Sequence, residues 1–223
     1  MKVRELIGTA AVPGGGELHL FRRGGDFIIA IGGNELMSSR MSGSEEALAT
    51  MSYARLAGRK APHLLIGGYG MGFTLRAALA ALGPDAKITV AELVPGIIDW
   101  ARGAMAELAA GALDDPRVEL VVGDVAAAIA DGRGQYDAIL LDVDNGPDAL
   151  THEANDRIYS AAGLAAAKAA LTRGGILAIW SAAPDARFTR RLAAAGFRVD
   201  EVGVRARSNG KGARHVIWFA TAG

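Results

Sequence analysis

The densest group of polar side chains in the chain follows the apolar run 136–141, in the sequence Asp142-Val-Asp144-Asn145. If this run is a strand that continues through the aspartates, its two-residue period places Asp142 and Asp144 on the same side. A carboxylate in a closed pocket can orient an amine and accept its proton. The alternative is an Asx-type turn that only reverses the chain. We predict that Asp142 and Asp144 are catalytic residues.

A glycine-rich segment lies between the apolar run that starts at His63 and a helical pattern that starts at Phe73. Glycine accepts positive φ and lets a ligand approach the backbone, so a strand, glycine loop and helix in series indicate a nucleotide cradle. Phe73 replaces the third glycine of dinucleotide sites, and no Lys-Ser/Thr pair of a P-loop follows. The loop suits an adenosine ligand without pyrophosphate, such as S-adenosylmethionine, although a glycine-rich turn without a ligand is the alternative. Its cofactor-binding candidates are Gly67, Gly68, Gly70 and Gly72.

Two further carboxylates follow predicted strands, where ligands of parallel sheets bind. Glu92 ends the run 87–92, and its oxygens can accept hydrogen bonds from both ribose hydroxyls. Asp124 follows the next apolar run and can accept a hydrogen bond from the adenine amine. Each has a structural alternative: Glu92 could cap the helix that opens at Pro95, and Asp124 could be the N-cap of the helix that opens at Val125.

The elements that position these residues alternate between strand and helix from Pro62 onward. Such alternation predicts crossover units and a mainly parallel sheet with helices on both faces. The last two strands are separated by a connection too short for a helix, so they should form an antiparallel hairpin. The fold class is therefore α/β, a doubly wound seven-stranded sheet of the class I methyltransferase type. Its predicted strands are 63–67, 87–92, 117–122, 136–141, 174–180, 197–204 and 214–220, with helices near 73–82, 95–110, 125–131, 155–171 and 185–195.

The N-terminal part differs in character. Short strand patterns separated by the turn signals Pro13-Gly-Gly-Gly16 and Arg23-Gly-Gly25 predict a small antiparallel meander of three strands before residue 40. A helix follows, with Ser44 as the expected N-cap, acidic residues in its first turn and Gly58 as its stop. We expect two units, a meander plus helix over 1–60 and a catalytic domain over 61–223.

Composition narrows the function classes. The 223-residue chain has 24 basic and 24 acidic residues, so no global charge draws it to nucleic acid or membrane. It has no Cys, and its four His residues are scattered, so we expect no metal site. The N-terminus lacks the apolar core of a signal peptide, and no run has membrane-spanning length. We expect a cytoplasmic protein. The basic run 205–215 could contact RNA phosphates, but an exposed hairpin tip is the favoured interpretation.

These motifs, in this order, resemble the spermidine synthases and their bacterial spermidine-synthase-like relatives. The resemblance is densest from Ala61 to about Gly175, and its most specific pieces are Asp114-Asp-Pro-Arg-Val118 before Gly123-Asp124 and the aspartate-rich turn at Asp142. It implies that Glu92 holds ribose, that Asp124 and Val125 hold adenine, and that Asp142 orients and deprotonates the attacking amine. The family reaction it implies is aminopropyl transfer from decarboxylated S-adenosylmethionine to an amine acceptor.

Three departures from the family pattern bear on the group transferred. Gly70 stands where the synthases have an aspartate facing the donor's aminopropyl end, and its loss would make space for a donor that carries a carboxylate. The helix segment 44–50 lacks the family's Tyr, His/Gln and Glu. The second acid of the aspartate turn is moved by one position, to Asp144.

We therefore expect a transferase that uses an S-adenosyl sulfonium donor, with methyl transfer from S-adenosylmethionine favoured over aminopropyl transfer from the decarboxylated donor to putrescine or a related amine. A non-catalytic nucleoside-binding protein is a further alternative. The expected acceptor is a small molecule, with an amine among the candidates. By analogy with the family, the N-terminal meander could pair two copies into a homodimer.

Overall fold

The computed structural model describes residues 3–56, 58–143 and 157–223 of the chain. Its main element is a seven-stranded sheet in the order β10-β11-β9-β8-β5-β6-β7, in which β11 alone runs antiparallel to its neighbours. Chain order reverses on either side of β5, so the crevice where doubly wound sheets bind ligands lies at the ends of β5, β6 and β8. The strands of this sheet are β5 (His63–Gly67), β6 (Lys87–Glu92), β7 (Val118–Val122), β8 (Tyr136–Leu141), β9 (Leu171–Ser181), β10 (Phe197–Arg205) and β11 (Arg214–Ala222).

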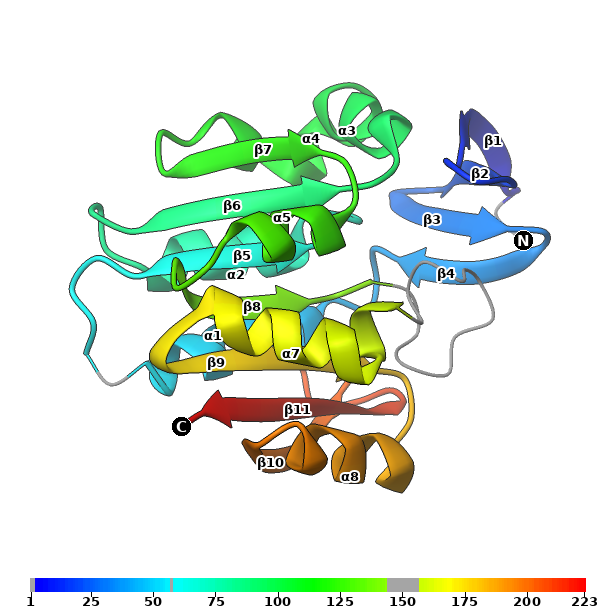
Figure 1. Ribbon diagram of the computed structural model, residues 1–223. Helices are drawn as coiled ribbons and strands as arrows, with labels where there is room; N and C mark the ends of the chain where they lie inside the picture. Colours follow the sequence, from blue (N-terminus) through cyan, green and yellow to red (C-terminus); the bar gives the residue numbers. More distant parts are fainter. Residues whose placement is uncertain (1–2, 57, 144–156) are drawn as a thin grey trace.

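Helices cover both faces of this sheet (Figure 1). Successive residues of β5 belong to different apolar clusters: Leu64 and Ile66 pack on one face, and Leu65 packs on the other. This is the two-residue alternation expected of a central strand that is buried on both sides. The helices of the first face are α1 (Gly43–Ala54), α2 (Phe73–Ala81), α3 (Pro95–Arg102), α4 (Ala106–Ala109) and the 3₁₀ turn η1 (Ala112–Asp114), and those of the second are α5 (Val125–Asp131), α7 (Ala161–Ala170) and α8 (Ala186–Ala194).

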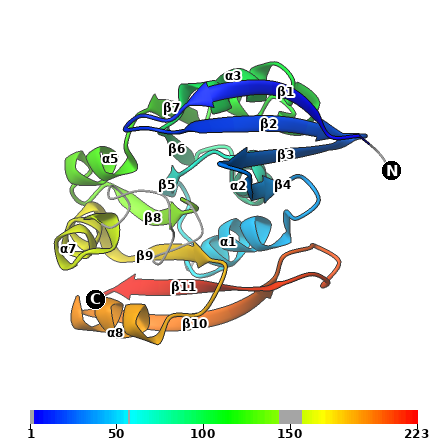
Figure 2. The ribbon, with the colours of Figure 1, turned by 90° about the vertical axis from the view of Figure 1, so that its right-hand side faces the viewer.

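A separate four-stranded antiparallel sheet stands across the carboxyl ends of the parallel strands (Figures 1 and 2). Close packing fixes it to α3, because a Cβ on Gly8 would lie 2.7 Å from the indole nitrogen of Trp100. A Cβ on Gly96 would likewise collide with the side chain of Ala10. The small sheet is thus held over the crevice. Its strands are β1 (Glu5–Ala11), β2 (Glu17–Arg23), β3 (Asp26–Ile31) and β4 (Asn34–Ser38).

The predicted fold class is confirmed, with corrections in detail. The N-terminal region has a fourth strand, β4, which the sequence analysis missed. Ser44 is not the N-cap of α1: that position is Ser42, and Ser44 is buried inside the first turn. The helix expected over 95–110 breaks at Gly103 into α3 and α4. No helix in the described ranges is long and apolar enough to cross a membrane.

The proposed division at residue 60 remains a prediction. The two sheets are distinct, yet α1, which belongs to the predicted first unit, packs between α2 and strands of the large sheet. In the views of Figures 1 and 2, α1 lies beside the large sheet rather than among β1–β4.

Candidate active site

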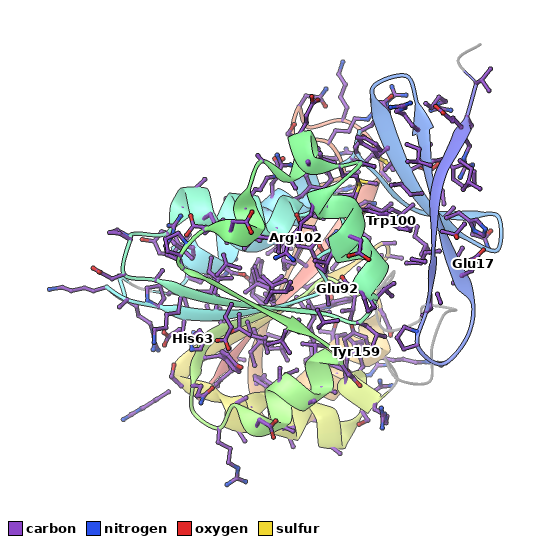
Figure 3. All side chains as sticks on the ribbon, turned by 90° about the horizontal axis from the view of Figure 1, so that it is seen from above. Glu17, His63, Glu92, Trp100, Arg102 and Tyr159 are labelled. Carbon is purple, nitrogen blue, oxygen red and sulfur yellow. The ribbon has the colours of Figure 1, made fainter. Side chains whose placement is uncertain are left out.

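A cavity of about 180 Å³ lies between the small sheet and the carboxyl ends of the large sheet. Figure 3 shows Glu92 at this end of the strands and His63 at the opposite end. The small sheet supplies an apolar wall, and the large sheet supplies most of the polar groups. The described residues that line the cavity are Val12, Leu18, Ile29, Ile31, Leu36, Met37, Glu45, Gly68, Gly70, Ala91, Glu92, Leu93, Val94, Ile97, Gly123, Asp124, Val125, Asp142, Val143 and Trp180.

The glycine loop follows β5 directly, and two of its four glycines, Gly68 and Gly70, line the cavity. Gly68 has φ +86°, and a Cβ there would lie 2.5 Å from the carbonyl oxygen of Asp142. That position therefore needs glycine to let two strand ends meet. Gly67 packs against Val125, and Gly72 is the N-cap of α2. Part of the glycine pattern thus serves the turn itself, as the alternative without a ligand anticipated, while Gly68 and Gly70 present backbone to the cavity.

Gly70 does not leave the open space that the sequence analysis expected. A Cβ at this position would lie 2.8 Å from the terminal methyl group of Met37, a residue of β4. The thioether of Met37 therefore fills the volume beside the loop. Because β4 was not predicted from the sequence, the position of the Met37 side chain beside Gly70 could not be predicted either.

Glu92 is 4% exposed and holds the glycine loop in place. One carboxylate oxygen accepts a hydrogen bond from the backbone N–H of Tyr69 at 2.8 Å, and the other accepts from that of Val94 at 2.8 Å. The structural alternative for Glu92 is therefore partly present, since Val94 immediately precedes α3. Burial raises the pKa of Glu92, and these backbone donors oppose that shift. The oxygen that accepts from Tyr69 also accepts from the backbone N–H of Gly70 at 3.5 Å, so the oxygen on the Val94 side is the one with more capacity for a hydroxyl in the cavity.

Asp124 combines two of the positions considered for it. Its side chain accepts a hydrogen bond from the backbone N–H of Ala126 at 2.8 Å, as the N-cap of α5, and it also lines the cavity. Arg157 approaches its other oxygen at 3.5 Å from outside the lining. Val125, the first residue of α5, lines the cavity and packs on Gly67.

Asp142 lies directly after β8, lines the cavity and accepts a hydrogen bond from the Thr74 hydroxyl at 2.9 Å. Its backbone N–H donates to the carbonyl of Gly67, which fixes the strand end beside the glycine loop. Removal from water raises the pKa of Asp142 to about 6, and the Thr74 hydroxyl partly opposes the shift. A carboxyl with this pKa can exchange a proton near neutral pH. Asp144, the second predicted catalytic residue, lies outside the described residues.

Glu45 is a site residue that the sequence analysis missed. It comes from the first turn of α1, is 7% exposed and lines the same cavity as Asp142. Burial and the neighbouring charge of Asp142 raise the pKa of Glu45 to about 8. The Ser44 hydroxyl donates a hydrogen bond to Glu45 at 2.8 Å and also contacts Nδ1 of His215 at 2.9 Å. Segment 44–50 therefore does contribute an acid to the site.

The helix phase carried the signal that would have found Glu45. The buried residues of α1 include Glu45, Leu48, Ala49 and Ser52, which are spaced as one face of a helix. An acidic residue in the first turn of a helix is usually explained by the helix dipole. Glu45 lies on the buried stripe, whereas Glu46 beside it is only half-buried. An acid on the apolar stripe points to a site and not to capping alone.

The charged groups of the lining are all acids. Among the described lining residues four are carboxylates, Glu45, Glu92, Asp124 and Asp142, and none is Lys, Arg or His. The described residues contain no group of three or more His, Cys, Asp or Glu that could hold a metal ion. Buried carboxylates need a cation, a proton or strong donors to compensate them. The cavity is therefore suited to cationic ligands.

A doubly wound sheet with a glycine loop after its first strand, and with carboxylates after the next ones, is typical of nucleotide-binding α/β folds. The match to a known family is more specific. The family model of the spermine/spermidine synthase domain covers residues 43–187, from the start of α1 into α8. The chain belongs to this family.

Individual relatives agree. The chain is 31% identical over 184 residues to a polyamine aminopropyltransferase of Corynebacterium efficiens, which covers 78% of this chain and 34% of the relative. It is 29% identical over 173 residues to one of Mycobacterium tuberculosis, covering 75% and 31%. It thus spans about a third of the length of these curated relatives. The crystal structure of spermidine synthase from Thermotoga maritima shares the fold, with a TM-score of 0.78 at 20% identity over 98% of this chain and 73% of that one.

These findings correct the functional expectation. The preference for methyl transfer from S-adenosylmethionine is wrong, because the matching family and these relatives are polyamine aminopropyltransferases. That preference rests on the three departures from the family pattern, among them the missing acid at Gly70 and the space it would open for a donor carboxylate. Met37 fills that space, and Glu45 brings another acid into the cavity.

Proposed function

We propose that the protein transfers an aminopropyl group from decarboxylated S-adenosylmethionine to a small amine such as putrescine. The observation that carries this proposal is the lining of acids without a basic side chain among its described residues. The donor is a sulfonium with a terminal ammonium, and the acceptor is an amine, so all the charges of the substrates are positive. A donor with a carboxylate would place a negative charge near Glu45 and Asp142, where no lining cation could compensate it.

Different residues along the edge of the large sheet bind different parts of the nucleoside. The backbone of Gly68 and Gly70 lies against the nucleoside, Glu92 binds the ribose hydroxyls with its remaining lone pairs, and Asp124 with Val125 borders the adenine. These roles are supported by the positions of the residues around one cavity.

Asp142 is the proposed base, supported by its position and raised pKa. The acceptor nitrogen attacks the carbon beside the sulfonium, a C–N bond forms as the C–S bond breaks, and the electron pair goes to sulfur. The product is 5′-methylthioadenosine. The proton of the attacking nitrogen passes to Asp142, and alignment of the two substrates supplies much of the rate.

The test is a product assay with paired donors. The purified chain is incubated with putrescine and with either decarboxylated S-adenosylmethionine or intact S-adenosylmethionine, and products are identified by mass spectrometry. We expect 5′-methylthioadenosine and spermidine in equal amounts from the decarboxylated donor only. Formation of S-adenosylhomocysteine and a methylated amine, or no product with either donor, would overturn the proposal.

Three coarser expectations accompany this function as proposals. Residues 1–60 form a unit of strands plus a helix beside a catalytic unit of 61–223, the protein works in the cytoplasm, and two copies pair through the small sheet. The last is supported by β1, an edge strand whose neighbourhood exposes Val3 and Leu6. Light scattering of the purified chain tests it, since a mass near 23.0 kDa would contradict pairing.

A further inference from the structure

Glu45 is only 7% exposed, yet it has no basic partner among the described residues. Its recorded side-chain partner is the hydroxyl of Ser44. Carboxylates this deeply buried are normally paired with a cation. Glu45 faces a cavity, so the missing partner can be a ligand.

Asp142 and Glu45 reach this cavity from different elements, the end of β8 and the start of α1, and Thr74 connects them. The Thr74 hydroxyl lies 2.9 Å from the carboxylate of Asp142 and 3.4 Å from the backbone carbonyl of Glu45. Thr74 therefore contacts both residues of this pair at the cavity that the two acids line. Asp142 follows β8, which lies on the other side of β5 from β6, which ends at Glu92, and from β7, which precedes Asp124.

Other residues in the cavity lining are apolar or aromatic. Leu36 and Met37 of the small sheet lie in the lining, as does Trp180 of β9. Trp180 is 8% exposed, and its indole N–H has no hydrogen-bond partner in the described part of the chain. A compact cation on an alkyl chain matches such surroundings: its charge meets the carboxylates, its chain meets the apolar wall, and indole rings attract cations.

The chemistry of the pair selects the kind of cation. A primary ammonium has three N–H donors and can donate to two carboxylates at once. Divalent metal ions prefer more oxygen ligands than two side chains provide. We propose that Glu45 and Asp142 together bind one primary ammonium group, which makes Glu45 a specificity-determining residue. This rests on the proposed function for the identity of the substrates, whose donor and acceptor both carry such a group.

A hydrogen-bonded chain through Ser44 and His215 orients Glu45. When Glu45 is ionised, the Ser44 hydroxyl donates its one proton to Glu45 and must accept from His215 at Nδ1. His215 is held in turn against the ring of Trp180, at a centroid distance of 4.8 Å. Burial lowers the pKa of His215, so it acts as a neutral donor and not as a competing cation near neutral pH.

The experiment compares Glu45→Gln with Glu46→Gln, which removes the same charge one position along α1 from a residue outside the lining. Each variant and the wild type are titrated calorimetrically with 5′-methylthioadenosine, with decarboxylated S-adenosylmethionine, and with putrescine on protein saturated with 5′-methylthioadenosine. Thermal melting checks that each variant is folded.

We expect Glu45→Gln to bind 5′-methylthioadenosine within twofold of the wild type and to lose about tenfold or more in affinity for an ammonium ligand, the loss of one charge-assisted pair. A loss with the decarboxylated donor places the donor's ammonium at the pair, and a loss with putrescine places the acceptor's ammonium there. Glu46→Gln should change neither.

Equal affinities of Glu45→Gln and wild type for both ammonium ligands would overturn the inference, as would a loss for 5′-methylthioadenosine of the same size. The two proposals fail separately. Wild type that binds putrescine through Glu45 but forms no spermidine keeps the ammonium site and removes the aminopropyl reaction. If the wild type forms spermidine but Glu45→Gln binds every ligand as the wild type does, the aminopropyl reaction stands and the ammonium site is removed.

Discussion

The two halves of the cavity use the same side-chain chemistry in opposite ways. In the half at the ends of β6 and β7, the carboxylates of Glu92 and Asp124 accept hydrogen bonds from backbone N–H groups. The donors are Tyr69 and Val94 for Glu92, and Ala126 for Asp124. In the half at the end of β8 and the start of α1, Asp142 and Glu45 have hydroxyl partners. Thr74 donates to Asp142 and Ser44 donates to Glu45, and the charge of Asp142 raises the pKa of Glu45. One half is built into the loop and helix starts of the fold. The other half has unused capacity for positive charge.

This difference teaches how to separate scaffold from ligand contact when both are acids. Backbone donors partly compensate a buried carboxylate before any ligand arrives, and removing that carboxylate leaves N–H groups without partners. A buried carboxylate beside another carboxylate is destabilised until a proton or a cation compensates it. The first kind should govern stability and nucleoside binding, and the second kind should govern cation binding and turnover.

The sharpest test of this division is Asp142→Asn. The amide cannot accept the proton of the attacking amine, so we expect kcat/KM to fall by about 10²- to 10⁴-fold, the usual contribution of a general base. Affinity for 5′-methylthioadenosine should stay within twofold, because the change lies in the cation half. Steady-state kinetics and calorimetry measure the two effects.

Asp131→Asn is the matched control for that change, since Asp131 is an exposed residue at the end of α5 and lies outside the cavity lining. It should keep wild-type kinetics. Retention of more than a tenth of wild-type turnover in Asp142→Asn would remove the base role and leave Asp142 as a positioning residue.

The fold was predictable because its signals are local. Strands 87–92 and 136–141 and the helix 125–131 were predicted with the bounds that the structure has, since each is a short apolar run or helical pattern between clear turn residues. The missed strand β4 is Asn34-Glu-Leu-Met-Ser38, which has only two large apolar residues and no clean alternation. Its pairing with β3 also contains a register shift, so tertiary contacts define it more than its own sequence does.

The site was predictable only where it follows the strands. Glu92, Asp124 and Asp142 were found because the carboxyl ends of parallel strands meet at one edge. Glu45 reaches the cavity from a helix that precedes the large sheet, and Met37 reaches it from the small sheet. Their convergence depends on how α1 and β4 dock, which no local pattern states. Both omissions led to the same mistake about the donor, because one residue supplies an acid and the other fills the space beside Gly70.

The scaffold half is tested by Glu92→Gln. The amide nitrogen must replace one oxygen that now accepts from Tyr69 or Val94, so one buried N–H loses its acceptor. We expect the free energy of unfolding to fall by about 1–3 kcal/mol, and affinity for 5′-methylthioadenosine to fall about tenfold as the glycine loop loosens. Urea denaturation and calorimetry measure these changes. Glu119→Gln on neighbouring β7, an exposed residue, serves as the control, and unchanged stability of Glu92→Gln would contradict the scaffold role.

The cation half predicts a pH effect on stability. Burial and Asp142 raise the pKa of Glu45 from 4.5 to about 8, so the folded protein holds a proton that the unfolded chain releases. The stability linked to this proton is complete below about pH 4.5 and is lost as pH rises to about 8. Urea midpoints at pH 5 and pH 8 should therefore differ less in Glu45→Gln than in wild type. The lowered pKa values of His63 and His215 give an opposite slope in both proteins, and the raised pKa of Glu92 gives a slope in the same direction in both. The difference between the proteins therefore reports Glu45 together with its neighbour Asp142. Parallel pH profiles would contradict this expectation.

The smallest expected effect concerns Asp124, where the two halves of the comparison overlap in a single side chain. Asp124→Asn keeps an oxygen that can cap α5 and accept from the adenine amine, so stability and affinity for 5′-methylthioadenosine should change little. Asp124→Ala removes both acceptors, and we expect a loss of about 1 kcal/mol in unfolding free energy from the missing cap, with a several-fold loss of affinity. If Asp124→Ala loses stability but binds 5′-methylthioadenosine as tightly as Asp124→Asn does, Asp124 is a helix cap that merely borders the cavity. The ligand role in this half would then rest on Glu92 and the loop backbone, because these groups also line the cavity and keep acceptors or donors directed at it.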